Sequence, residues 1–361
     1  MRRILLMVLA ALCLEGTALA AELDEELGAG KVTAAAPPAA REILGDTGAA
    51  EADLNNGLER LAVRVEELLP GALREAVRPL AAIVVICLLC GVGDNLSPGG
   101  GSGFDAVGMG GSLAVAVIGV SDVRSVLSLG TTTLAELTDF SRVLLPTLTT
   151  AAAAAGAPGS AAAAYAAAAL FSDVLLSAAE RLILPAVCAY TAVIVCSAVL
   201  GEKRLGGAAK LLEWGAKTLL KALVISFTAY LSLSGILAGS ADAAAVKAAK
   251  TVISAALPVV GKLMADASEA LVAGAGLVRG AVGIYGLLIC LAVILLPVLR
   301  LGLRCLLFRA VAALCAGFAG ERQSQLIAGL GNAYGMMLGL IASAAVIEFL
   351  AVISLIRTVM I

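Results

Sequence analysis

The feature that most limits the fold of this chain is a set of long apolar segments in which charge is almost absent. Leu182–Leu200 and Ala281–Leu299 contain no charged residue, and Leu219–Gly239 and Met336–Ile356 contain one each. A helix of about 20 apolar residues spans the hydrocarbon core of a bilayer. The whole chain is 61% hydrophobic and 14% charged, against about 45–50% and about 25% in soluble proteins. The sequence therefore predicts an all-α, polytopic membrane protein.

Other segments are apolar but shorter or interrupted, and they set the uncertainty in the number of spans. They are Leu80–Cys90, Leu113–Leu134, which Asp122 and Arg124 interrupt, Val143–Leu170, which Gly156–Gly159 divides, and Leu306–Phe318 with Arg309 inside it. Counting them gives about six to eight transmembrane helices. Residues 80–361 are therefore predicted to form one multi-spanning membrane domain.

The first twenty residues have the pattern of a secretory signal peptide. Arg2 and Arg3 precede the short apolar run Ile4–Leu14, and Ala18–Ala20 provides a small-residue cleavage site. We expect residues 1–20 to be this signal, the alternative being a retained first membrane helix. In either case the following segment is expected outside the cytoplasm.

Residues 21–79 differ from the rest of the chain because they are acidic, with twelve Asp or Glu residues against six Lys or Arg. Ala34–Pro38 has the composition of a flexible linker. Beyond it, leucines and a valine recur every three or four residues and predict one apolar face of an amphipathic helix that ends at Pro70: Leu54, Leu58, Leu61, Val65 and Leu68. This face either binds a partner or membrane surface, or packs on the protein's own bundle.

Basic residues predict the orientation of the spans. They gather in 201–221 and 300–322, which we interpret as short cytoplasmic loops. An odd number of crossings must then separate the N-terminal segment from Gly201. The five predicted crossings meet this condition: Leu80–Cys90, Leu113–Leu134, the two halves of Val143–Leu170, and Leu182–Leu200. One more crossing after Gly201 places Ser240–Gly280 outside the cytoplasm. Its half-apolar composition predicts re-entrant or interfacial helices.

Glycines and prolines mark candidate positions of close packing and of helix distortion. Small residues at intervals of four let helix backbones approach closely in lipid, and this spacing occurs at Gly276, Gly280, Gly331, Gly335 and Gly339. The same pattern serves either packing within the chain or homo-oligomerisation. Candidates for helix kinks or re-entrant turns are Pro146, Pro185, Pro258, Gly261 and Pro297.

The sequence offers little that could carry out a reaction. It contains no His, which excludes Ser-His and Cys-His nucleophile pairs and the common zinc sites. The pair Cys87 and Cys90 lies among aliphatic residues. We therefore predict no enzyme activity, no catalytic, cofactor or metal site, and no nucleic-acid binding. Glu348 is the one acid inside a clear span, where it serves in a hydrogen bond, at the membrane edge, or in ion coupling.

An ordered series of Pro and Gly landmarks resembles the stage III sporulation protein AE family. The landmarks are Val143-Leu144-Leu145-Pro146 through Phe171 to Leu184-Pro185-Ala186, then Leu257-Pro258-Val259-Val260-Gly261, Asp266–Glu269, Gly283-Ile284-Tyr285-Gly286 and Leu296-Pro297-Val298-Leu299. They extend over roughly residues 60–361. The chain departs from the family in its Ala richness and has no matching landmark before residue 60.

This resemblance implies a role in endospore formation. A member of the family would lie in the mother-cell membrane around the forespore, within a complex related to specialised secretion systems. Its partners would be other stage III sporulation membrane proteins and a cytoplasmic ATPase, and it would be a candidate for the membrane channel or export gate. The residues alone leave a free-standing solute transporter or permease as the alternative, although no repeated halves are visible.

Overall fold

The computed structural model describes residues 29–44, 54–96, 106–154, 158–201, 205–256 and 260–357. It also describes most side chains in these ranges, and the main exception is the stretch 232–279. All secondary structure in the described ranges is helical. The helices are α2 (Ala29–Ala35), α3 (Pro38–Leu44), α4 (Leu54–Leu96), α5 (Ala106–Ala154), α6 (Pro158–Ala178), η2 (Ala179–Ile183), α7 (Leu184–Leu200), α8 (Leu205–Ala256), α9 (Val260–Cys315) and α10 (Glu321–Arg357).

The predicted all-α polytopic membrane fold is confirmed. Five helical segments of the described residues are long and apolar enough to cross a membrane: Leu54–Gly93, Val107–Ala154, Ala161–Leu200, Gly280–Cys315 and Glu321–Ile356. The predicted span Leu219–Gly239 lies on α8, and the side chains of its last part, 232–239, lie outside the described residues. The signal peptide at 1–20 also lies outside the described residues.

The predicted division into crossings was wrong at three places in the described chain. Leu113–Leu134 and the first half of Val143–Leu170 are not separate crossings, because both lie on the single helix α5. The second half of Val143–Leu170 and Leu182–Leu200 fall in the one span Ala161–Leu200, and Leu306–Phe318 lies mostly in the same span as Ala281–Leu299, Gly280–Cys315. Asp122 and Arg124 do not interrupt this helix. The break inside Val143–Leu170 falls between the end of α5 and the start of α6.

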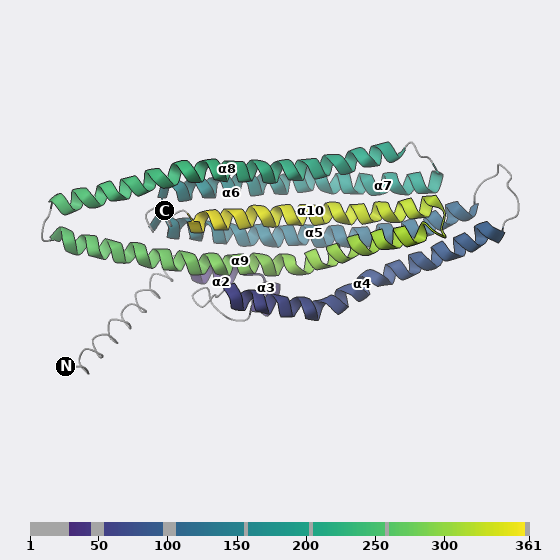
Figure 1. Ribbon diagram of the computed structural model, residues 1–361, viewed down its shortest axis with the longest axis horizontal. Helices are drawn as coiled ribbons and strands as arrows, with labels where there is room; N and C mark the ends of the chain where they lie inside the picture. Colours follow the sequence, from purple (N-terminus) through teal and green to yellow (C-terminus); the bar gives the residue numbers. More distant parts are fainter. Residues whose placement is uncertain are drawn as a thin grey trace.

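The helices are much longer than a bilayer requires. The 49 residues of α5 and the 56 of α9 correspond to about 74 and 84 Å at about 1.5 Å per residue, whereas the hydrocarbon core is about 30 Å thick. Figure 1 shows these helices lying side by side in one elongated bundle. A large part of each long helix therefore extends beyond the hydrocarbon core.

The antiparallel helices α9 and α10 form the centre of the bundle. In each, 61% of the most apolar window is buried, about twice the share in the corresponding windows of the outer helices. α5 runs along them, α4 packs against α9, and α6, α7 and α8 cover the opposite side (Figure 1). The core thus forms around one central helical hairpin.

The basic segments predicted as loops are mainly helical. Arg300, Arg304 and Arg309 lie on α9, which continues to Cys315, and Lys210 lies on α8. The end of α7, the start of α8 and the connection 316–320 between α9 and α10 lie at the same end of the bundle (Figure 1). Within Ser240–Gly280, residues 240–256 belong to α8 and residues 260–280 to α9, whereas residues 257–259 and the side chains of 240–279 lie outside the described residues.

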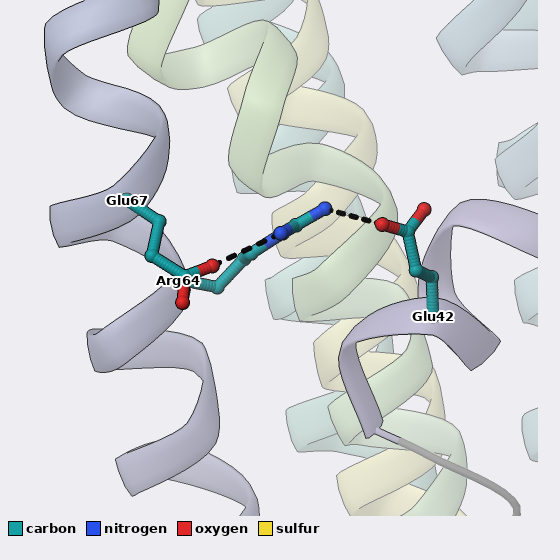
Figure 2. Close-up of polar contacts among 3 residues, drawn as sticks. All are labelled: Glu42, Arg64 and Glu67. Atoms are coloured by element: carbon teal, nitrogen blue, oxygen red, sulfur yellow. Dashed lines mark hydrogen bonds and ion pairs between the residues drawn. The ribbon is translucent and has the colours of Figure 1, made fainter.

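The N-terminal segment also departs from the prediction. Ala34–Pro38 is not a flexible linker, since α2 and α3 pack on α5 and α9 through an apolar face spaced every four residues: Val32, Ala36, Ala40 and Leu44. Arg64 of α4 lies between Glu42 of α3 and Glu67, at 2.6 and 3.0 Å (Figure 2). These exposed pairs contribute little stability, so the apolar face is the main attachment.

The predicted amphipathic helix does not end at Pro70. α4 continues through Pro70 and Pro79 to Leu96 and so joins the two predicted regions, 21–79 and 80–361, in one helix. Leu61 of the predicted apolar face is buried, whereas Leu54 and Leu58 are about 40% exposed. The face therefore packs on the bundle only in part.

Proline positions correlate with helix irregularity in one case. Pro185 has no N–H to donate to the carbonyl of Arg181, and the preceding turn is the π-helix η2 between α6 and α7. A π-helical turn absorbs such a defect without ending the helix. α5 and α9 continue without interruption through Pro146 and Pro297.

Gly91 permits the close approach of α4 to the connection between α9 and α10. A Cβ at this position would overlap the backbone carbonyl oxygen of Phe318, whereas a Cβ at Gly71 on the same helix would meet nothing within 4 Å. Because a backbone atom cannot move aside as a side-chain end can, we expect Gly91→Ala to destabilise the protein by about 1–3 kcal/mol. Thermal unfolding in detergent measures this effect.

The matched control is Gly71→Ala, for which helix propensity predicts a gain of up to about 1 kcal/mol. Equal unfolding temperatures for the two variants would contradict the proposed contact.

Candidate functional site

A buried ion pair joins three helices inside the bundle. Arg304 of α9 donates from Nε to Asp122 Oδ2 of α5 at 3.1 Å, and Tyr334 of α10 donates from its hydroxyl to the same oxygen at 2.7 Å. The side chains of Arg304 and Asp122 are 9% and 13% exposed. Tyr334 is fully buried and its ring packs edge-on against Phe308. The carboxylate of Asp122 is therefore held from two sides.

A second polar group lies closer than the ion pair to the end of the bundle at which α7 ends and α10 begins. Asn332 of α10 donates to Glu213 of α8 at 3.3 Å and accepts from Arg309 of α9 at 3.1 Å. Glu213 also pairs with Lys217. These contacts bridge α8, α9 and α10.

A polar cavity opens beside this group. Its volume is about 680 Å³, and it lies between α7, α8, α10 and the start of α5. Charged side chains of both signs line it, among them Lys210, Glu213 and Arg322, together with Tyr190 and Asn332. Apolar side chains, Ile194 and Leu326 among them, complete the lining, and the volume lies within the range of ligand pockets.

Glu348 forms a third buried group, on the side of α10 that faces α5. Its residue is 3% exposed, and its Oε1 accepts a hydrogen bond from Ser172 of α6 at 2.9 Å. On α10, Tyr334 follows Gln323 by 11 positions, close to three helical turns, and Glu348 follows Tyr334 by 14 positions, close to four turns. Polar contacts therefore recur along one side of α10.

Sequence analysis found Glu348 but missed Asp122, Arg304 and Tyr334 as partners. It treated Asp122 as a break in a span and Arg304 as a charge in a loop. The signal that could have identified the pair is an acid inside one apolar segment, Asp122, and a base directly between two others, Arg304, because such charges usually pair inside a membrane bundle.

The predicted glycine positions face different neighbours. A Cβ on Gly331 would lie 3.3 Å from Arg309 Cγ, and one on Gly335 would lie 3.6 Å from Cys305 Sγ, both on α9. Gly339 faces Leu220 of α8 at 3.6 Å, and Gly280 has no atom within 4 Å. The described contacts of Gly331, Gly335 and Gly339 are thus within the chain, and homo-oligomerisation stays a prediction.

Three predicted positions cannot be compared with the structure. Pro258 and the side-chain surroundings of Gly261 and Gly276 lie outside the described residues. Within the described ranges, no group of three or more His, Cys, Asp or Glu side chains is placed to hold a metal ion. The described polar groups instead join helices and line the cavity.

The comparisons with known proteins extend the resemblance seen in the landmarks. The profile of stage III sporulation protein AE matches residues 48–359. The chain belongs to the stage III sporulation protein AE family. No curated protein and no solved structure matches it. The family predicted from the sequence is confirmed, and its profile covers α4 to α10, including the ion pair, the cavity and Glu348.

The ion pair yields a stability prediction for this member of the family. Asp122→Ala leaves the Arg304 guanidinium buried and unpaired, so we expect a loss of about 3–5 kcal/mol. Tyr334→Phe removes one hydrogen bond to a charged group and should cost about 1.5–3 kcal/mol. Thermal or denaturant unfolding of the purified protein in detergent measures both.

Two further variants test whether pairing is the cause. Replacing both charges, as Asp122→Leu with Arg304→Met, should cost less than Asp122→Ala alone, because no lone charge remains. The control Asp139→Ala, at an exposed pair with Arg142, should stay within about 0.5 kcal/mol. A similar loss in the two Ala variants would contradict the buried pair.

Proposed function

We propose that this protein is the multi-spanning membrane subunit of the sporulation complex that connects the mother cell with the forespore, and that it forms the membrane channel or export gate of that complex. The observation that carries the proposal is the family match over residues 48–359 on a bundle of apolar helices. The role is one of passage and assembly, without catalysis.

The polar interior of the bundle supports a role in passage. Polar contacts can serve only to hold membrane helices together, but this bundle also encloses charged side chains: Arg304 and Glu348 are buried, and the side chain of Asp122 is 13% exposed. It also has a polar cavity of about 680 Å³ at one end. Charged groups inside membrane bundles are costly and commonly mark pathways for solutes or ions.

The length of the helices supports a role in assembly. α5 and α9 exceed the hydrocarbon core by about 40 Å or more, which provides helical surface outside the lipid for other proteins. The partners in this proposal are the other stage III sporulation membrane proteins and a cytoplasmic ATPase. The site of action is the mother-cell membrane around the forespore.

Orientation in the membrane gives the first test of this proposal. The end of the bundle that carries Lys210, Arg309 and Arg322 is expected in the cytoplasm, and the end near Gly159 outside. We therefore expect a membrane-impermeant maleimide to label Gly159→Cys in intact vegetative cells and Gly317→Cys only after permeabilisation. Both variants are made after Cys188 and Cys196 are replaced by Ser, because these native cysteines are exposed.

Labelling of Gly317→Cys in intact cells would reverse the proposed orientation. Labelling of both positions after permeabilisation serves as the control that each cysteine is reactive.

Deletion of the gene in the native host tests the role itself. We expect a loss of heat-resistant spores of several orders of magnitude, restored by the wild-type chain and by Asp139→Ala. A substitution that obstructs the cavity at a half-buried lining position, such as Ala328→Trp, should reach the membrane at the wild-type level and fail to restore spores. Normal spore yield after deletion would contradict the sporulation role, and full restoration by Ala328→Trp would contradict passage through the cavity.

A further inference from the structure

Glu348 has the most deeply buried carboxyl group of the described residues, and only one of its two oxygens has a hydrogen-bond partner. Oε1 accepts the hydrogen bond from Ser172 at 2.9 Å. Oε2 has no hydrogen-bond partner, and neither has the hydroxyl of Ser141, which lies beside the carboxyl group on α5. Two buried polar atoms of neighbouring residues are therefore unsatisfied, which is uncommon in folded proteins.

No described cation offsets a negative charge on this group. None of the described ion pairs includes Glu348. On α5, Asp139 and Arg142 flank Ser141, but they pair with each other at the surface and are each about 70% exposed. On α6, Asp173 is exposed, and on α9 the neighbour is the buried thiol of Cys290. An ionised Glu348 would thus be a lone charge inside the bundle, a state that proteins avoid.

We propose that Glu348 is a proton-binding site, occupied as the neutral acid, with its hydrogen on Oε2 and donated to Ser141 Oγ. One proton gives both unsatisfied atoms a partner, because a protonated carboxyl group becomes a donor while a hydroxyl oxygen accepts. Donation from Ser141 to an ionised Oε2 would also join the two atoms, but it would leave a buried charge with no cation to offset it, which protonation removes. Ser172 continues to donate to Oε1. The three helices α5, α6 and α10 then share one continuous hydrogen-bonded group.

A proton fits this site better than a metal cation does. Four side-chain oxygens converge here, two from Glu348 and one each from Ser141 and Ser172, whereas hard metal ions in proteins take about six or more oxygen ligands. Helical carbonyls nearby are used within their own helices. The site needs only the smallest cation, and this inference does not depend on the proposed role in sporulation.

Infrared spectroscopy of the purified full chain in detergent at neutral pH tests the proposal directly. We expect the C=O stretching band of a protonated carboxylic acid in the wild type and its loss in Glu348→Gln, which keeps the shape and hydrogen bonds of a neutral acid. The matched control Glu213→Gln should retain the band, because Glu213 is paired with Lys217. Equal band intensity in the wild type and in Glu348→Gln would overturn the proposal.

Two further measurements keep the test decisive. The band should be the same in sodium chloride as in choline chloride. Loss of the band when sodium is added would overturn the proposal, because it would show that a metal cation binds the carboxyl group in place of the proton. Ser141→Ala retains Glu348 and removes the proposed acceptor, so the band should persist and shift to higher frequency. An unshifted band would contradict the contact with Ser141, even if Glu348→Gln failed to fold.

Discussion

The bundle depends on a constraint that lipid imposes on every helix within it. Apolar side chains gain little by leaving lipid tails for one another, so close packing and interhelical polar contacts must hold the helices together. α9 and α10 meet this constraint at the centre, where Gly331 and Gly335 let α10 lie against Arg309 and Cys305. α5 then packs on this hairpin: its Leu144 lies against Gly286 of α9, and its Gly119 lies against Leu330 of α10.

Polar contacts supplement this packing at several levels of the bundle. Asp122 ties α5 to α9 and α10, Glu213 and Asn332 tie α8 to α10, and Glu348 ties α6 to α10. Each group is satisfied only when helices distant in sequence stand at the correct height. The polar residues therefore fix the register of α10 against its neighbours, which apolar contacts alone define weakly.

The sequence predicted the fold class and the family, because both depend on features that persist along the chain: apolar segments and the order of Pro and Gly landmarks. It did not predict the helix boundaries. Pro70 and Asp122 usually interrupt helices or spans, but in this protein α4 and α5 are long enough to be supported on both sides of them. The partnership of Asp122 with Arg304 was also missed, since 182 positions separate them and only the fold brings them together.

The length of α9 has a mechanical consequence. A continuous helix of 56 residues, supported on several sides over much of its length, behaves as a stiff rod. α9 runs without a break from Val260 to Arg309, and Arg309 donates a hydrogen bond to Asn332, which lines the cavity. A displacement of α9 along its axis would therefore pull on a side chain in the cavity wall, far from the point where the displacement began.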